Sequence, residues 1–413
     1  MSHLNTTFSP PKGFTLILLI WYLIVLCYCL YKRELVVKTD QLEIVENREF
    51  LHKNVTKTIL LWNGVRRKEV RIFGTGNQIF AKQNCPVNRC EIVNNRTERP
   101  IESYDAIIVV FHDELITPYE LQMPEFPNGR NPNQRLVFLT QEPPTSLKRY
   151  YNTSHITNFF NWTMTYRMDS DIPFLYGRVL PKEMAPRTTE EITHYREMAK
   201  KISKPLQESQ LRNKTKTIAW MVSHCKTHGQ REKYVEELRK YMDVDIYGSC
   251  GNGKFFCQRH GTYFSEPQCN KVIESTYKFY LSFENSFCKD YVTEKFFKIL
   301  DLYMIPIVYG GADYTQHAPP HSYIDALKYK PKELAAYLKI LDADNALYNE
   351  YFWWKDHYRV EFISEYTSRH GFCGLCQKLH DIQTQFKSFA DQRVISDLGD
   401  DSKCQPIDPN LVA

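Results

Sequence analysis

The sequence predicts an α/β protein with two domains, each built on a parallel sheet that helices cover on both faces. The chain has 413 residues, which is enough for two domains with substantial cores. Its strand candidates are short apolar runs that end in polar or turn residues, as strands buried on both faces do. Two such runs lead into an amphipathic helix and then into another strand, which indicates a right-handed crossover unit.

Composition indicates an ordered globular protein and excludes two other classes. Hydrophobic residues make up 43% of the chain and aromatic residues 14%, which is too much for an intrinsically disordered protein. The formal net charge of +5 is only mildly basic. It suits an anionic partner, but it is too small to predict nucleic-acid binding, and the sequence carries no nucleic-acid-binding motif.

The N-terminus predicts membrane attachment. Residues 14–31 form an uncharged run of 18 residues between basic flanks, which is long enough to span a bilayer. We expect a signal anchor that follows a cytoplasmic tail at 1–13 and precedes a polar stem at 32–57. A cleaved signal peptide is the alternative, but the run contains Trp21 and lacks a small-residue cleavage site.

Two features predict that the rest of the chain lies in an oxidising lumen. Ten of the twelve cysteines follow the apolar run, an even number that suits disulfides. Five acceptor sequons for N-glycosylation also follow it, at Asn54, Asn95, Asn152, Asn161 and Asn213. We therefore expect a single-pass type II membrane protein.

The first domain is expected at residues 58–195. Its strand candidates are Thr58–Trp62, Ala106–Phe111 and Leu136–Thr140. The third strand runs into Gln141-Glu142-Pro143-Pro144, so Glu142 lies at the carboxyl end of a strand, where open α/β sheets bind ligands. From the residues alone, Asp113 and Glu114 are equally good candidates for a functional carboxylate.

The second domain is expected at residues 196–380, after a charged linking segment and before a polar tail at 381–413. It opens with a complete strand–helix–strand unit. The elements of this unit are a strand at 217–223, a helix at 231–242 and a strand at 244–248.

Residues 277–311 repeat this unit. The strand Phe279–Phe283 ends in Glu284-Asn285-Ser286, a helix starts at Asp290–Lys295, and Pro306 ends that helix before the strand Ile307–Tyr309. A lysine in the first turn of a helix opposes the helix dipole, so Lys295 suggests a bound polyanion such as a diphosphate. A solvated lysine is the alternative.

Three runs in this stretch resemble the donor-binding signature of the α-1,3-fucosyltransferases, glycosyltransferase family 10. They are FYLSFENS at 279–286, DYVTEKFF at 290–297 and IPIVYGG at 305–311. A further run, WTMTYRMDSD at 162–171, resembles another segment of the family, and the likeness covers roughly residues 57–376. It implies a GT-B fold, in which two Rossmann-like domains face one another across a cleft.

The resemblance also implies an activity: inverting transfer of L-fucose from GDP-fucose to an N-acetylglucosamine hydroxyl of a glycan, in the Golgi membrane. Glu142 matches the proposed catalytic base of the family. The residues implied in donor binding are Arg231, Tyr247, Glu284, Asn285, Ser286, Tyr291, Glu294 and Lys295. His224 stands where the family usually has asparagine, which puts donor affinity in question.

The family implies neither a metal nor a redox centre. Asp169-Ser170-Asp171 has the form of a D-x-D metal motif, but the resembling family uses none, so we expect no required cofactor and leave stimulation by Mn²⁺ open. Cys373 and Cys376 match a structural pair of the family, and we expect them to bond to Cys85 and Cys90. A zinc site is conceivable at Cys250, Cys257, His260 and Cys269, but the spacing fits no common finger.

Two alternatives remain at this stage: a lumenal transferase with another nucleotide sugar, and a catalytically silent, membrane-anchored glycan-binding protein. The motif residues Glu142, Arg231, Glu294 and Lys295 favour an active enzyme. The sequence leaves open the acceptor, the occupancy of the sequons and whether the protein forms a homodimer.

Overall fold

The computed structural model describes residues 55–63, 65, 67–111, 131–147, 159–201, 211, 213–251, 267–362, 364–381 and 404. From Lys57 onward these residues belong to one compact unit. The predicted cytoplasmic tail, the predicted membrane span and most of the predicted stem lie outside them. Within the described ranges, no helix combines the length and hydropathy that a membrane crossing requires.

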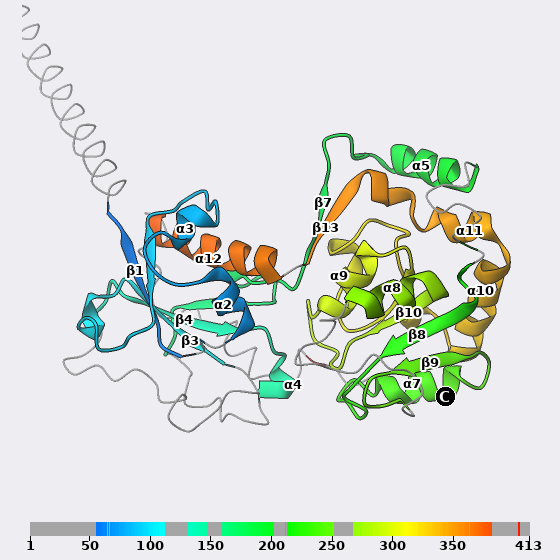
Figure 1. Ribbon diagram of the computed structural model, residues 1–413, viewed down its shortest axis with the longest axis horizontal. Helices are drawn as coiled ribbons and strands as arrows, with labels where there is room; N and C mark the ends of the chain where they lie inside the picture. Colours follow the sequence, from blue (N-terminus) through cyan, green and yellow to red (C-terminus); the bar gives the residue numbers. More distant parts are fainter. Residues whose placement is uncertain are drawn as a thin grey trace, which may run out of the picture. The chain divides into compact units, whose positions relative to one another are not determined.

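Six parallel strands form the first sheet, in the order β2-β1-β3-β4-β5-β6 (Figure 1). The strands are β1 (Lys57–Leu61), β2 (Cys90–Val93), β3 (Ala106–Val110), β4 (Arg135–Thr140), β5 (Trp162–Thr165) and β6 (Ile172–Pro173). The three strands predicted in this domain appear within one residue of their expected bounds. Every residue of β3 and β4 is buried, which confirms that this sheet is covered on both faces.

Alternate residues of the first sheet pack into two layers. One layer packs against the helices α2 (Lys68–Phe73), α3 (Ile79–Lys82) and α12 (Ser364–His380). The other layer packs against Tyr104, Phe111 and Phe160, and against Leu147 of the short helix α4 (Pro144–Leu147). Helix α12 comes from the end of the chain and lies beside α2 and α3 in Figure 1, although sequence order had assigned it to the second domain.

The second sheet has five parallel strands in the order β12-β11-β10-β8-β9. The strands are β8 (Lys216–Met221), β9 (Val244–Tyr247), β10 (Tyr277–Phe283), β11 (Ile305–Tyr309) and β12 (Ile324–Asp325). The strand order of both sheets is that of a doubly wound fold, in which the chain reverses direction across the sheet after its second strand. The predicted α/β class is therefore confirmed.

Helices cover both faces of the second sheet. The helices on one face are α7 (Arg231–Leu238), α10 (Pro331–Ala343) and α11 (Asn345–Glu350). The helices on the other face are α8 (Pro267–Thr276) and α9 (Glu294–Asp301). Helix α7 begins where predicted but ends four residues earlier, and α9 begins at Glu294 and not at Asp290.

The prediction that Pro306 ends helix α9 is wrong. The helix ends at Asp301, and Pro306 is the second residue of β11. Tyr309 O accepts a hydrogen bond from Glu284 N, so the backbone N–H and C=O groups of the odd residues of β11 point toward β10. The backbone groups of Pro306 point toward the opposite neighbour, β12. On that side β12 begins only opposite Ile307, so the missing N–H of Pro306 costs the sheet no hydrogen bond.

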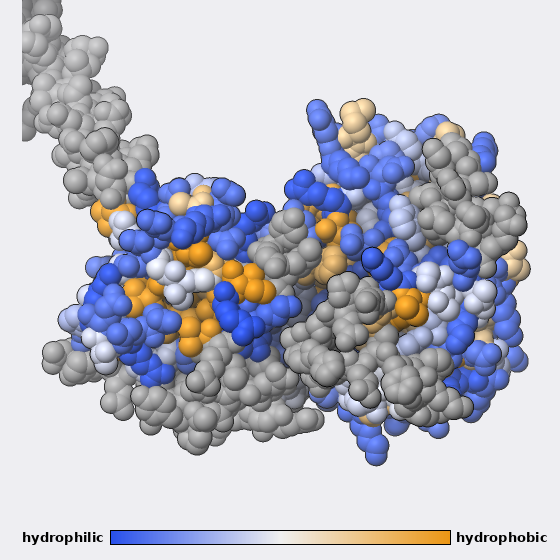
Figure 2. All heavy atoms as spheres, in the orientation of Figure 1, coloured by the Kyte–Doolittle hydropathy of each residue, from blue (hydrophilic) through white to orange (hydrophobic). Residues whose placement is uncertain are grey.

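A helix and a two-stranded ribbon connect the two sheets. Helix α5 (Thr189–Lys201) includes the predicted domain boundary at residues 195 and 196. The strand β7 (Arg178–Pro181) pairs antiparallel with β13 (Tyr358–Glu361), so the chain leaves and re-enters the first-sheet region side by side. Figure 2 shows a mainly hydrophilic described surface, with hydrophobic side chains visible around α2 and α12.

Candidate active site

The carboxyl ends of β8 and β10 meet where the strand order of the second sheet reverses, which is where doubly wound sheets bind ligands. The loop after β8 contacts the end of β10, because Gly229 N donates to Asn285 O over 2.8 Å. A Cβ on Gly229 would lie 3.1 Å from that oxygen. Glycine therefore lets the two chain segments approach each other at this edge.

Glu284 follows β10 directly and is fully buried against the start of α9. Its Oε1 accepts hydrogen bonds from N and Oγ1 of Thr293, at 2.8 and 2.9 Å. Thr293 is the N-cap of α9. The Nζ of Lys295 donates to Thr293 Oγ1 at 2.8 Å and lies 3.3 Å from both Glu284 Oε2 and Glu294 Oε1. Two carboxylates therefore already offset the charge of Lys295, which weakens the argument that the lysine alone indicates a polyanion.

The two carboxylates beside Lys295 titrate differently. Burial raises the pKa of Glu284, although the Lys295 ammonium acts against this. Burial also acts to raise the pKa of Glu294, but the charge of Lys295 and hydrogen bonds outweigh it, so this pKa is lowered. Glu294 is thus the carboxylate that keeps its negative charge beside Lys295 as the pH falls.

Glu142 is half-buried at the carboxyl edge of the first sheet, as its position after β4 predicts. Its backbone N donates to Thr140 Oγ1 at 3.1 Å. The preceding residue is held as well, because the Tyr176 hydroxyl donates to Gln141 O at 2.7 Å. The turn that carries Glu142 is therefore held by the side chains of Thr140 and Tyr176.

Tyr291 connects the carboxyl edges of the two sheets. Its ring lies 6.2 Å from that of Tyr176, edge to face, and it is only 2% exposed. Burial is the largest cause that raises the pKa of Tyr291, and Tyr176 adds to it. The negative charges of Glu142, Glu284 and Glu294 act in the same direction. One buried hydroxyl thus lies within the electrostatic reach of the predicted base and of the Lys295 cluster.

Asn285 and Tyr314 each bury a polar atom at this edge. The sequence predicted a role for Asn285 but none for Tyr314. Asn285 Oδ1 and the Tyr314 hydroxyl have no hydrogen-bond partner among the residues that the structure describes. The Cβ position of Gly310 lies 2.6 Å from the Tyr314 hydroxyl and 3.4 Å from Cγ of Glu284. Buried polar groups are costly unless they are hydrogen-bonded, so both atoms are candidates for contact with a bound molecule. No local sequence pattern marks Tyr314.

Arg231 lies at the same edge, and Tyr247 is the last residue of β9. Arg231 is 2% exposed, and its guanidinium donates to Phe283 O and, over 3.4 Å, to His224 O. The Tyr247 hydroxyl lies 2.9 Å from the hydroxyl of Tyr277, at the opposite end of β10 from Glu284. The role of Tyr247 in donor binding stays a prediction.

The two aspartates of the D-x-D sequence bind separate protein groups. Asp169 accepts hydrogen bonds from Arg167, at 2.8 and 2.6 Å, and from Lys289 Nζ at 2.9 Å. The hydrogen bonds from Arg167 are the largest cause that lowers the pKa of Asp169 to about 2. Asp171 Oδ2 accepts from the backbone N and Oγ1 of Thr163. Both carboxylates therefore hold parts of the protein together, which is a structural role.

Four disulfides are described. Cys85 bonds to Cys373 and Cys90 bonds to Cys376, the partners that the resemblance implied, so two bridges tie α12 to the first sheet. The other two, Cys225–Cys250 and Cys288–Cys404, were not predicted. Cys269 is disulfide-bonded as well. The zinc alternative loses Cys250 and Cys269 as ligands, because zinc binds thiolates.

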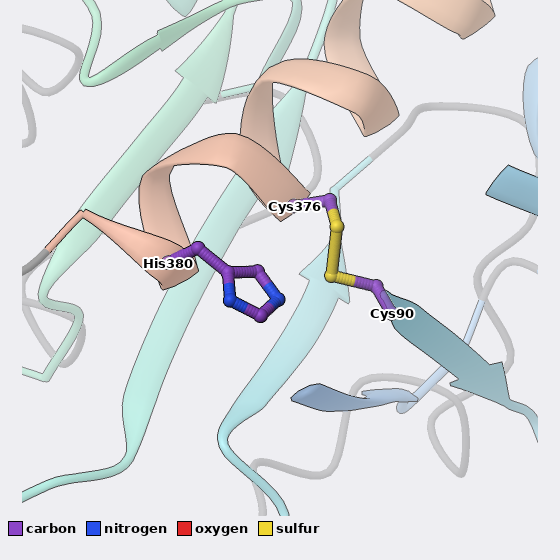
Figure 3. Close-up of side chains that lie close together, drawn as sticks. All are labelled: Cys90, Cys376 and His380. Atoms are coloured by element: carbon purple, nitrogen blue, oxygen red, sulfur yellow. A yellow bond between two sulfur atoms is a disulfide. The ribbon is translucent and has the colours of Figure 1, made fainter. Parts of the chain in front are cut away.

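Cys90, Cys376 and His380 offer ligand atoms within 4.8 Å of one another. Figure 3 shows that the two sulfurs are joined to each other and that the imidazole lies beside them. His380 Nε2 also contacts Arg89 O at 2.9 Å, and burial lowers the pKa of this histidine. With both cysteines in a disulfide, this group is a structural contact of α12 and not a thiolate metal site.

The sequons differ in exposure. Asn95 and Asn213 are exposed. Asn161 is half-buried, and its Oδ1 accepts a hydrogen bond from Leu136 N at 2.8 Å, so its amide already supports the start of β4. Asn54 and Asn152 lie outside the described residues.

Two models of known protein families match this chain. The family model described as "Fucosyltransferase, N-terminal" matches residues 54–177, and "Glycosyltransferase family 10 (fucosyltransferase) C-term" matches residues 211–396. The chain belongs to glycosyltransferase family 10, the fucosyltransferases. Glu142 lies in the N-terminal match, and all eight predicted donor-binding residues lie in the C-terminal match.

Curated relatives agree with the family assignment. Alpha-(1,3)-fucosyltransferase C of Drosophila melanogaster is 39% identical over 343 residues, which cover 79% of this chain and 74% of that protein. Glycoprotein 3-alpha-L-fucosyltransferase A of the same species is 38% identical over 331 residues, 79% of this chain and 57% of that protein. A crystal structure of an alpha1,3-fucosyltransferase with GDP has a TM-score of 0.45 at 16% identity, over 81% of this chain and 92% of that one. As a family 10 member, the chain is a glycosyltransferase.

Proposed function

We propose that this family 10 fucosyltransferase transfers L-fucose from GDP-fucose to an N-acetylglucosamine hydroxyl of a glycan, in α-1,3 linkage and with inversion. The observation that carries the proposal is the contact between Tyr291 and Tyr176, whose rings lie 6.2 Å apart, because the Tyr176 hydroxyl donates to Gln141 O beside Glu142. The turn of the first sheet that carries Glu142 is thereby joined to the segment that leads into α9, where Lys295 lies. The names of the relatives, alpha-(1,3)-fucosyltransferases, support the donor sugar and the linkage.

In the proposed reaction the acceptor hydroxyl attacks C1 of fucose while the bond from C1 to the diphosphate oxygen breaks. Glu142 accepts the proton of the hydroxyl as the new bond forms, and the bonding electrons leave with GDP. The cations of Lys295 and Arg231 would stabilise the negative charge that grows on the diphosphate. Glu294 would keep Lys295 oriented through their 3.3 Å contact.

The remaining donor contacts follow from the positions of the side chains. Asn285 and Tyr291, at the carboxyl edge of the second sheet, would hold the sugar or the nucleotide, and Tyr314 joins them on the strength of its unpartnered buried hydroxyl. The GT-B arrangement, with acceptor and donor on different sheets, is part of the proposal. We propose no required metal.

The proposed setting is the Golgi membrane, with residues 14–31 as the anchor and the catalytic part in the lumen. The support is the uncharged run itself, together with the sequons and disulfides that follow it. Digestion of sealed membranes with protease would test this. If protease without detergent removed the body of the protein and left only a fragment from the N-terminal tail, the lumenal placement would be wrong.

A transfer assay tests the function. The full-length chain, purified in detergent, would be given GDP-fucose with a panel of core N-glycans and free lactosamines, beside Glu142→Gln and the exposed control Glu183→Gln. We expect transfer to one acceptor class, a loss of at least a thousandfold in Glu142→Gln, and full activity in Glu183→Gln. A folded wild type that binds GDP and transfers to no acceptor would support the glycan-binding alternative. Transfer from another nucleotide sugar, and not from GDP-fucose, would support the alternative of a lumenal transferase with a different donor.

A further inference from the structure

A hydrogen bond joins the turn that carries Glu142 to the turn that carries Glu284. Thr145 Oγ1 and Ser286 Oγ lie 2.8 Å apart, although 141 residues separate them in the chain. Thr145 is the third residue after Glu142, in α4, and Ser286 is the second residue after Glu284. The contact therefore connects the carboxyl edge of the first sheet with that of the second.

The hydrogen bond has a protected and stiff environment. Ser286 is 2% exposed, so water competes little for its hydroxyl. Pro143 and Pro144 fill both positions between Glu142 and Thr145 and restrict the backbone there. Pro143 O also accepts hydrogen bonds from Ser146 N and Leu147 N, at 2.9 and 3.1 Å. A displacement of Thr145 is therefore passed on to Glu142.

Tyr176 makes a second, independent link between the same two edges. Its hydroxyl donates to Gln141 O, and its ring packs against Tyr291. The Glu142 turn is thus held before the carboxylate by Tyr176 and after it by Thr145. With one contact on each side, the backbone that carries Glu142 is held at two points.

We propose that the Thr145–Ser286 hydrogen bond sets the position of Glu142 relative to the bound donor, which makes both hydroxyls positioning residues of the transfer reaction. The inference rests on the proposed function. It also changes the role of Ser286, which the sequence assigned to donor binding, because the Ser286 hydroxyl bonds to the turn that carries Glu142. Near-attack geometry is sensitive to displacements of about 1 Å, so such a contact acts on the chemical step more than on donor binding.

Steady-state kinetics of the full-length chain test the proposal, with Thr145→Val, Ser286→Ala and the double variant. We expect each single change to lower kcat about tenfold, with the KM for GDP-fucose within twofold of wild type, and the double variant to be no slower than either single one. Thr145→Ser keeps the hydroxyl and should retain at least half of the wild-type kcat. Ser146→Ala, on the next residue of α4, is the matched control and should be unchanged.

Results that differ from these expectations would each overturn a different part of the proposal. An active wild type with unchanged Thr145→Val, or losses that multiply in the double variant, would overturn the positioning role. A raised KM for GDP-fucose in Ser286→Ala alone would make Ser286 a donor contact only. A wild type that transfers no fucose would overturn the proposed function and the inference with it. If Thr145→Val fails to fold, judged by its thermal transition, Ser286→Ala and the Thr145→Ser rescue still decide.

Discussion

The Cβ position of Gly177 lies 2.3 Å from the ring carbon Cγ of Phe297. Gly177 stands between β6 and β7, directly after Tyr176, and Phe297 belongs to α9 of the second sheet. No real Cβ tolerates such a contact, and Phe297 offers its own Cβ at 2.7 Å as well, so a ring rotation would not relieve it. Glycine at 177 therefore permits α9 to approach the segment that holds the Glu142 turn.

We predict that Gly177→Ala destabilises the protein by about 1–3 kcal/mol, the usual cost of an overpacked contact. The transfer rate should fall as well, because Tyr176 is the adjacent residue. Thermal unfolding followed by circular dichroism measures the first effect. Gly374→Ala in α12 is the matched control: its Cβ would meet Ile172 at 3.5 Å, an ordinary contact, so stability should be unchanged or slightly higher. Equal effects of the two changes would contradict the argument.

Glu350 gives stability that depends on pH. It is 5% exposed in α11, and its Oε1 accepts from Arg196 Nε and Nη2 at 3.0 and 2.7 Å, while Lys200 Nζ lies 3.2 Å from Oε2. Burial acts to raise the pKa of Glu350, but His321, stacked nearby on Tyr351, and Arg196 outweigh it and hold the pKa at about 2. The ion pairs join α11 to α5.

Because the pKa in the folded state is below the ordinary value of 4.5, the folded state favours the ionised form. The contribution to stability is complete above about pH 5 and is lost as the pH falls toward 2. We predict that Glu350→Gln costs about 3 kcal/mol near neutral pH. The difference in melting temperature from wild type should shrink between pH 5 and pH 3. Glu197→Gln, an exposed partner of Lys200, should show no such trend. A difference that stays constant with pH would sink this assignment.

The fold was predictable where a pattern is local. Each strand predicted from an apolar run appears, because such runs have few other ways to be buried. Glu142 and Glu284 were placed at strand ends for the same reason. The two-residue strands β6 and β12 carry no detectable pattern, and nothing local in the residues of α12 indicates which sheet that helix will meet.

The site was less predictable, because it depends on contacts between distant segments. Strand alternation indicates the face on which Tyr247 lies, but not that its hydroxyl meets Tyr277. Nothing local marks Tyr314, Cys288 or the Thr145–Ser286 contact. The exception is Thr293, which the N-cap preference for threonine before a helix start could have identified.

The bridges Cys85–Cys373 and Cys90–Cys376 should stabilise the protein in a non-additive way. They close loops of almost equal length, with sequence separations of 288 and 286 residues. With one bridge in place, the other restricts only a short additional stretch, so we predict a loss of about 2 kcal/mol for either pair changed to alanine. Removal of both opens the long loop and should cost roughly 7 kcal/mol.

Chemical denaturation of the two pair variants and of the quadruple variant measures this difference. The pair Cys225→Ala and Cys250→Ala is the control, since its loop spans only 25 residues and lies elsewhere in the chain. Its loss should add simply to that of either α12 bridge. If the losses of the two α12 bridges also add simply, the shared-loop explanation is wrong.

Removal of metal should leave the proposed transfer reaction intact, because the D-x-D carboxylates are engaged by the protein. Asp169 lies between Arg167 and Lys289, and Asp171 accepts from Thr163. A divalent cation would have to displace these donors. We predict that enzyme dialysed against EDTA keeps at least half of its rate with GDP-fucose.

Any stimulation by Mn²⁺ should be the same in wild type and in Asp169→Asn, since the cation would then act on the diphosphate and not on Asp169. The matched control is Asp313→Asn, an aspartate that accepts hydrogen bonds from Thr315 and Gln316. Loss of activity in EDTA that Mn²⁺ restores in wild type and in Asp313→Asn, but not in Asp169→Asn, would make Asp169 a metal ligand. A rate that falls in Asp169→Asn without any metal dependence would instead reflect the loss of the ion pairs of Asp169 with Arg167 and Lys289. The pair with Lys289 joins the loop after β5 to the segment that leads into α9.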